Sequence, residues 1–269
     1  MTVIVSVKIN DGIVAATDSA VSFQNGMIYQ HANKVVNLCK GYPVGAMVTG
    51  AAGIGNESIY TLLKDLRHRL AGNDINHQDW KLNPANFTVS EVAQKVRQFI
   101  FCEKIDDARV NDISILIRVF GYSVGRPLPE MWDIKVFESK CEQILEAQSE
   151  QHFGVRWEGE MEAIDRLLFG LGTQFVSSVQ KLGVDLDKAI EARNKIMEDI
   201  KALLVVPAMP IQDAIDLAEY LVQTTVGYVR FNFNQPVKTV GGAIEIATIT
   251  KHEGFKWVQR KHFYSPEIN

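Results

Sequence analysis

Hydrophobic and polar positions alternate along the first fifty residues with the period of two that is typical of β-strands. The valines at positions 3, 5 and 7 fall on one face of the first expected strand, and the residues at 4, 6 and 8 fall on the other. Asn10 to Gly12 reads as a tight turn into a second strand over 12–21. Two further strands, 33–38 and 42–50, flank Lys40 and Gly41. We therefore expect antiparallel hairpins up to Gly50.

The hydrophobic spacing changes to that of a helix over residues 56–70 and again over 88–101. Asn56 is the expected N-cap of the first helix, because its side chain can accept a free backbone N–H. Thr88 and Glu91 have the spacing of a capping box at the start of the second helix. The segment between the two helices is polar and rich in turn residues.

Strand-like and helix-like spacings of hydrophobic residues alternate through the rest of the chain. Strands are expected over 112–123, 131–137 and 143–148, helices over 159–170, 185–204 and 210–225, and a closing hairpin over 242–250 and 255–263. No Pro-, Gly- or Ser-rich linker interrupts this order, so residues 1–269 are expected to form one domain. The hairpins favour antiparallel sheets, so the fold class is predicted as α+β. A four-layer αββα sandwich, with two stacked antiparallel sheets flanked by helices, would bury each hydrophobic face.

Composition narrows the functional classes. Of the 269 residues 46% are hydrophobic and 22% charged, and the net charge of −4 gives no sign of a nucleic-acid or anionic-membrane partner. No hydrophobic run approaches the roughly 18 residues of a membrane span. We also expect no signal peptide, and a mature N-terminus at residue 1 or 2. The three cysteines are scattered without metal-ligand spacing, which favours a reducing cytoplasm and no metal site.

Thr2 is the first candidate for chemistry, because a strand begins directly behind the initiator methionine. An N-terminal threonine carries a hydroxyl nucleophile and, in its own α-amino group, a base. Such an amine has a pKa of roughly 7.7 to 8.0 in model compounds, so it is partly neutral near pH 7. A small second residue is what removal of Met1 generally requires. A nearby lysine, held by a carboxylate, would favour the developing alkoxide.

The opening stretch TVIVSVKINDGIVAATDSA resembles the start of a mature proteasome β-type subunit, and of the related bacterial ATP-dependent peptidase ring. These are N-terminal-nucleophile (Ntn) hydrolases. Thr2, Asp18 and Lys34 stand at the spacing of the family's nucleophile, carboxylate and lysine. The letters VTG followed by AAGIG resemble its oxyanion-hole turn and point to Gly50, and VGGAIEIATIT resembles its late paired-glycine strand. The resemblance covers residues 2–56 and 240–250.

The resemblance implies a threonine-type peptidase that acts on peptide or protein substrates without metal or cofactor and assembles as a homo-oligomer, in a ring or stacked rings. Its catalytic residues would be Thr2, Asp18, Lys34 and Gly50. By alignment, the pocket for the residue before the cut bond would be lined by Val21, Ala32, Val36, Val48 and Ala52. Since all five are uncharged and small or branched, an apolar side chain is expected there. His31 is either a further residue of the cleft or an ordinary surface residue.

Departures from the family's pattern, among them three single positions, keep other functions open. Ala20 replaces an arginine that often follows the carboxylate, Val240 replaces the late serine, and Val237 stands in place of an aspartate that steadies the terminus. One alternative is a catalytically inactive ring or scaffold subunit. Another is a threonine amidohydrolase or transpeptidase with one specific substrate. The sequence does not identify an unfoldase partner for any of these.

Overall fold

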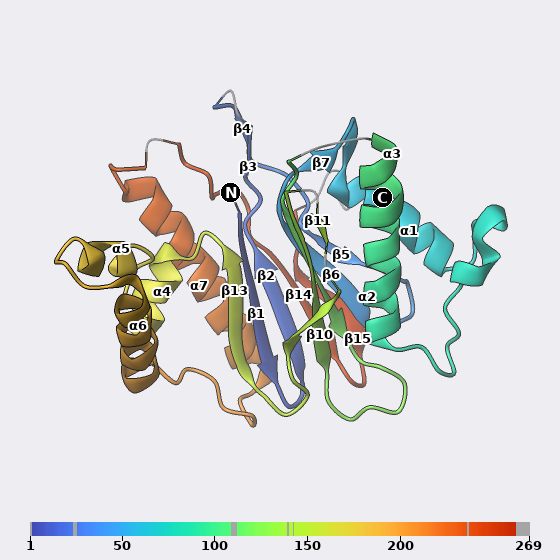
Figure 1. Cartoon of the computed structure of the whole chain (residues 1–269). Coiled ribbons are helices and arrows are strands. Elements are labelled where there is room, and N and C mark those ends of the chain that lie inside the picture. Colours follow the sequence, from blue (N-terminus) through green and yellow to red (C-terminus); the bar gives the residue numbers. More distant parts are fainter. Residues whose placement is uncertain are drawn as a thin grey trace.

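The computed structural model describes residues 2–23, 26–108, 112–138, 140–141, 143–235 and 237–261 of the chain. It is a mixed α+β fold in which every strand pairing in the described part is antiparallel. Figure 1 shows helices on both outer sides of a central β region. The N-terminal end of β1 lies at the same end of the molecule as the short strands β3, β4 and β7.

The first sheet has five strands in the order β13-β1-β2-β14-β15. The expected hairpin of the opening residues forms its centre, because Ile4 to Ile9 pair with Thr17 back to Gly12. The closing hairpin of the chain adds two more strands beside β2. The bounds are β1 (Val3–Ile9), β2 (Gly12–Thr17), β13 (Gly154–Gly159), β14 (Glu245–Thr250) and β15 (Gly254–Gln259).

The second sheet has the order β11-β10-β9-β6-β5, and β12 also pairs with β10. Its bounds are β5 (Val35–Asn37), β6 (Val44–Gly50), β9 (Ile115–Gly121), β10 (Glu130–Phe137), β11 (Lys140–Cys141) and β12 (Leu145–Gln148). Two short hairpins lie outside both sheets, formed by β3 (Val21–Ser22) with β4 (Ile28–Tyr29) and by β7 (Gly53–Ile54) with β8 (Glu57–Ser58).

Helices cover the two sheets from opposite sides (Figure 1). α7 contacts β1, β2 and β14 of the first sheet, whereas α1 and α2 contact β5, β9 and β10 of the second. The main helices are α1 (Ile59–Leu70), α2 (Val89–Arg97), α4 (Glu162–Phe169), α6 (Leu186–Ile200) and α7 (Ile211–Phe231). Shorter helical segments are a 3-10 helix at Ile75–Trp80, a π-helical turn at Gln98–Ile105, α3 (Asp106–Ala108) and α5 (Phe175–Gln180).

The two sheets meet face to face over a buried apolar layer that includes Ile4, Ile13, Met47 and Phe120. Polar side chains also lie inside this layer. Arg118 is fully buried, binds Asp133 through two hydrogen bonds of 2.7 and 2.8 Å, and donates a third of 3.1 Å to the Ser6 hydroxyl. Since Ser6 belongs to the first sheet and Arg118 to the second, this bond joins the sheets. A buried ion pair of this kind needs full hydrogen bonding to offset its desolvation.

The structure differs from the expectation at several elements. The strand expected over 12–21 ends at Thr17, and the helix expected over 185–204 ends at Ile200. A strand at Gly154–Gly159 precedes the second helical block, and it forms an edge of the first sheet beside β1. Ser58, not Asn56, caps α1, because the Ser58 hydroxyl accepts the Thr61 N–H at 3.1 Å. α7 continues past position 225 to Phe231. Thr88 caps α2 as expected, with its hydroxyl 3.0 Å from the Glu91 nitrogen.

Residues 262 and 263, at the end of the expected closing hairpin, lie outside the described residues, as does Met1. Within the described part of the chain, none of the helices combines the length and the apolar character needed to traverse a bilayer.

Candidate active site

Asp18 is the centre of the hydrogen-bond network at the start of β1. Its side chain is fully buried immediately after the end of β2. Oδ1 accepts the Val3 N–H at 3.1 Å and the Lys34 ammonium at 2.7 Å. Oδ2 accepts the backbone N–H groups of Ala20 at 3.1 Å and Gly241 at 3.0 Å. Four donors therefore hold one carboxylate, and two of them come from the segments that carry Thr2 and Lys34.

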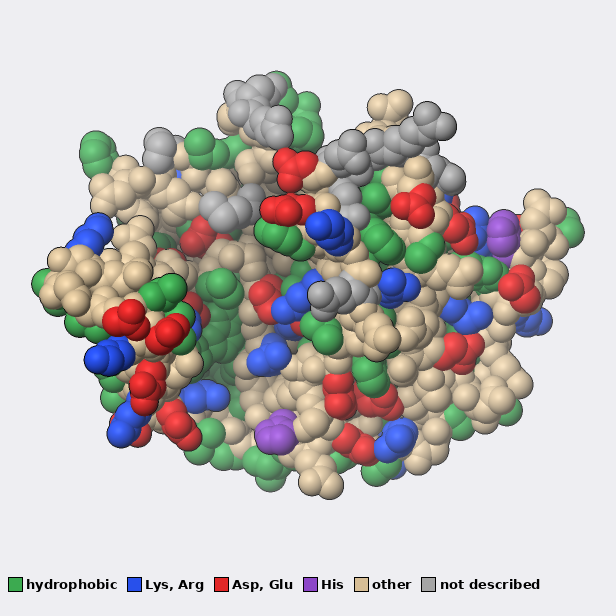
Figure 2. Space-filling view, viewed as in Figure 1, with side chains coloured by type: hydrophobic (Ala, Val, Ile, Leu, Met, Phe, Trp, Pro, Cys, Tyr) green, Lys and Arg blue, Asp and Glu red, His purple; other side chains and the backbone are tan. Residues whose placement is uncertain are grey.

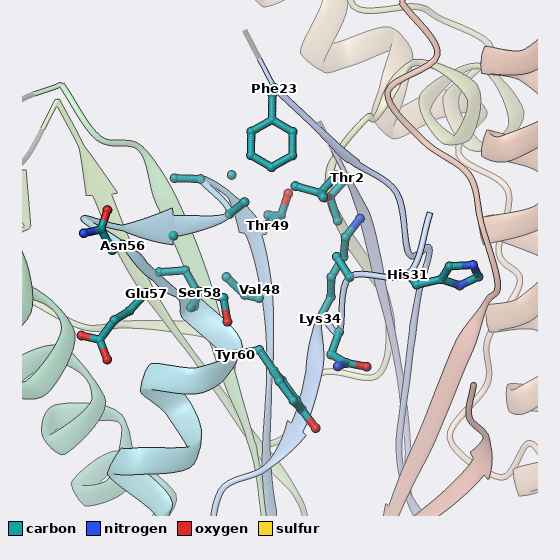
Figure 3. Close-up of a pocket in the computed structure, with 18 of the residues that line it drawn as sticks. Thr2, Phe23, His31, Lys34, Val48, Thr49, Asn56, Glu57, Ser58 and Tyr60 are labelled. Carbon is teal, nitrogen blue, oxygen red and sulfur yellow. The ribbon is translucent and has the colours of Figure 1, made fainter. Parts of the chain in front are cut away.

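Lys34 lies immediately before β5 and is 5% exposed. Figure 3 shows the Lys34 amine pointing toward Thr2. Burial lowers the pKa of Lys34 below its usual value, and the Asp18 carboxylate opposes this by favouring the charged form. A second buried amine, that of Lys261, lowers the Lys34 pKa further. Lys34 is thus an ion-paired lysine whose charge is less strongly retained than that of a surface lysine.

Thr2 itself is almost completely buried, with 4% of its surface exposed. Its carbonyl accepts the Glu160 N–H at 2.8 Å, and Val3, the next residue, pairs with Gly159. Gly159 has a φ of +92°, and a Cβ added there would lie 1.9 Å from the Thr2 carbonyl oxygen. Only glycine permits this approach. The edge strand β13 therefore fixes the backbone of Thr2, although the sequence did not point to Gly159.

Thr2 and Lys34 line a cavity of about 480 Å³. Residues of β6, β7, β8 and the first turn of α1 complete its wall opposite the β3 hairpin. Figure 3 shows Phe23 at one end of the labelled lining residues, near Thr2, and Tyr60 at the other end. Neither aromatic residue was predicted, because their positions around the cavity depend on how the β3 hairpin and α1 pack.

Four of the five predicted pocket residues line this cavity: Val21, Ala32, Val48 and Ala52. Val36 does not, because its side chain is 2% exposed and packs in the core between the second sheet and its helices. His31 contributes to the lining, although Figure 3 shows its ring turned away from Thr2. Glu57 adds a carboxylate to the wall. The cavity thus combines small apolar side chains with a few polar groups.

Gly50, the predicted oxyanion donor, ends β6 and also lines the cavity. Its φ is +102°, and a Cβ there would lie 2.4 Å from the Ser114 carbonyl oxygen on the neighbouring chain segment. A side chain at position 50 would therefore strain the backbone and push Ser114 away. The structure brings Thr2, Asp18, Lys34 and Gly50 together at one end of the two sheets.

A second hollow of about 560 Å³ lies between β13 and the helices α4 and α6. The space-filling view shows hydrophobic side chains inside it (Figure 2). Its lining includes Trp157, whose indole N–H donates to the buried Asp165 carboxylate at 2.9 Å. None of the predicted catalytic or pocket residues lines this hollow. The threonine cavity is therefore the candidate active site.

Among the residues that the structure describes, no three His, Cys, Asp or Glu side chains gather so as to hold a metal ion. A scan against models of known protein families gives no match to this chain, and a search of curated proteins gives none either.

Proposed function

We propose that this chain is an N-terminal-threonine hydrolase, a peptidase that cleaves amide bonds through an acyl-enzyme once Met1 has been removed. The observation that carries the proposal is that Thr2 and Lys34 line one cavity, while the buried Asp18 accepts hydrogen bonds from the Lys34 amine and from the N–H of Val3, the residue after Thr2. Met1 lies outside the described part of the chain, so its removal is also proposed.

The proposed reaction has two halves. The Thr2 hydroxyl attacks the substrate carbonyl, and its proton passes to the threonine α-amine and from there to the leaving amine. The Lys34 ammonium lowers the energy of the developing alkoxide, and Asp18 holds that lysine in place. The Gly50 N–H stabilises the oxyanion. Water then attacks the ester carbonyl, and its proton returns to the threonine oxygen as the acyl group leaves as a carboxylate.

We extend the proposal to the fold and assembly. The face-to-face contact of two antiparallel sheets, with α7 on one outer side and α1 and α2 on the other, supports a four-layer αββα sandwich of the Ntn type. Large apolar side chains that remain exposed near α5, α6 and α7 support a homo-oligomeric ring: Leu182 at 83%, Leu203 at 81%, Phe231 at 78% and Phe233 at 96%. Free cysteines throughout the described part are consistent with the proposed cytoplasmic location.

Intact mass and peptide turnover test the function together. The expressed protein is expected to lack Met1 and to hydrolyse fluorogenic peptides. Thr2→Ala should abolish turnover, whereas Thr2→Ser should retain a measurable part, because serine keeps a hydroxyl beside the amine. Thr224→Ala, on the outer helix α7, is the matched control and should leave turnover unchanged.

The other functions give different results. Retained Met1 with no turnover in any variant would favour an inactive scaffold. Loss of Met1 with no turnover of general peptide libraries would favour an amidohydrolase or transpeptidase with a single substrate. Sedimentation of the same samples tests the ring, and a monomer at micromolar concentration would contradict it.

A further inference from the structure

Two buried charges beside the candidate active site have no role in the proposed reaction. Glu245 begins β14 and is fully buried, and Lys261 follows the end of β15. The Lys261 amine lies 3.2 Å from Glu245 Oε2, and its side chain is only 8% exposed. Within the described residues, no other donor bonds to the Glu245 carboxylate. Lys261 is therefore the cation that compensates this carboxylate.

Lys261 also joins the segments that hold Asp18 and Lys34. Its amine donates to the Ser19 hydroxyl at 2.8 Å and to the Ala32 carbonyl at 2.7 Å. Ser19 directly follows Asp18, and Ala32 lines the cavity two residues before Lys34. The Ala32 N–H donates to the Ser19 carbonyl at 2.9 Å, so the two segments already touch. One lysine thus fixes both segments to β14.

The charges of Lys261 and Glu245 change the pKa of Lys34 in opposite directions. Among the described residues, the charged side chains that act on its amine are those of Asp18, Lys261 and Glu245. The positive charge of Lys261 lowers the Lys34 pKa, and the negative charge of Glu245 raises it by a smaller effect. Burial lowers the pKa of Lys261 itself, while Glu245 and Asp18 oppose that change and Arg260 adds to it.

We propose that Lys261 is a positioning residue for the candidate active site, which anchors the segment before Lys34 and sets the charge environment of the Lys34 amine. This inference deepens the proposed function and rests on it for its catalytic consequence. Lys261 is not among the residues that line the cavity, so it acts through Lys34 and Ala32 and not on the substrate.

The first test does not depend on activity. Lysine labelled with ¹³C at Cε is titrated by NMR in the full chain, and Lys34→Arg identifies the Lys34 signal. Lys261→Met should raise the titration midpoint of Lys34, because a positive charge is lost. Glu245→Gln should lower it, because a negative charge is lost. Opposite shifts are the signature of a charge effect, since loosening of the structure would move both variants the same way.

Lys261→Met leaves Glu245 buried without a counter-ion and can therefore unfold the protein. The double variant Lys261→Met/Glu245→Gln removes both charges and keeps the proposal testable. Its Lys34 midpoint should lie above that of Glu245→Gln alone, because these two variants differ only in the positive charge at position 261, which lowers the Lys34 pKa. A midpoint in the folded double variant equal to or below that of Glu245→Gln would overturn the proposal.

The second test is kinetic. The double variant should lower kcat on the order of 10- to 100-fold with KM unchanged, because misplaced catalytic groups cost rate without loss of cavity contacts. Lys261→Arg should recover part of this loss. Lys256→Met, an exposed lysine on β15, is the matched control and should change neither constant. A lower kcat in that control would contradict a specific role of Lys261.

If the wild-type protein turns over no substrate, the proposed function fails, and the titration alone decides the role of Lys261.

Discussion

Lys34 donates a 2.7 Å hydrogen bond to Asp18, and the two side chains are 6% and 0% exposed. Three backbone N–H groups bind the same carboxylate, including that of Val3, the residue next to the candidate nucleophile. The Asp18–Lys34 ion pair therefore neutralises two buried charges, and the same carboxylate helps to hold the first residues of the chain in place. A buried pair tolerates loss of both partners better than loss of one, because an unpaired charge then remains.

Lys34→Met should lose nearly all turnover and lower the free energy of unfolding by about 3–5 kcal/mol, because Asp18 is left without its counter-ion. Asp18→Asn should destabilise the protein to a similar degree. The double variant should be less destabilised than the sum of the two single variants. Urea unfolding and kcat on a peptide reporter measure these effects. Lys40→Met, an exposed lysine in the same half of the chain, is the control. Additive losses in the double variant would contradict a direct pairing.

Gly159→Ala should displace Thr2, since the added Cβ would lie 1.9 Å from the Thr2 carbonyl oxygen. We expect a lower free energy of unfolding and a loss of turnover of at least about tenfold, as a shifted nucleophile is poorly aligned. Gly183→Ala is the matched control, because Gly183 has a similar φ of +85° with nothing within 4 Å of an added Cβ. It should lose about 1–2 kcal/mol from backbone strain alone and keep its turnover. Equal turnover losses in both variants would disprove the proposed contact.

The small apolar wall of the cavity should favour Leu, Phe or Tyr before the cut bond over charged residues, because burial of an unpaired charge is costly. A fluorogenic peptide library measures this preference in the wild-type protein. Val21→Asp should shift it toward Lys and Arg, since Val21 lines the cavity. Val36→Ala should lower stability and leave the preference unchanged, because Val36 is buried away from the cavity. Best cleavage after acidic or basic residues in the wild-type protein would refute the assigned pocket.

Cys39 should resist alkylation while the protein is folded. Its side chain is buried, and burial raises the pKa of its thiol to about 11, so at pH 8 on the order of one molecule in a thousand carries the reactive thiolate. The rate should rise about tenfold for each pH unit toward that value. Cys102 is exposed and should react first with iodoacetamide, as followed by peptide mass spectrometry. Equal rates for the two cysteines in the folded chain would contradict the buried position of Cys39.

Local patterns predicted those elements whose stability depends on neighbouring residues in the chain. The opening hairpin follows from alternation around Asn10 to Gly12, and the start of α2 follows from Thr88. The close approach of Asp18 and Lys34 was also expected, and the structure places them 2.7 Å apart. That expectation depended on resemblance to a family, because spacing alone does not bring two residues from separate segments of the chain together.

Lys8 illustrates where local reasoning stops. Alternation placed it with Ile4 and Ser6 on one face of β1, yet it does not indicate whether that face meets water or another sheet. In the structure Lys8 is fully buried, and its amine donates to the carbonyls of Ser149 and Glu150 at 2.9 and 3.0 Å. Strand β13 was missed for a related reason. It is short and half-buried, and only its pairing with β1 identifies it as a strand.

The sequence by itself determined the strand and helix periods, the antiparallel hairpins and a threonine at the start of a strand. Tertiary structure decided what surrounds that threonine. Gly159 against its carbonyl, Gly241 on the Asp18 carboxylate and Lys261 behind Lys34 are each more than a hundred residues away along the chain. Hydrogen bonds and charges act over a few ångströms in space whatever the separation in sequence, so strand pairing within the first sheet and the packing of the two sheets together bring these groups into contact.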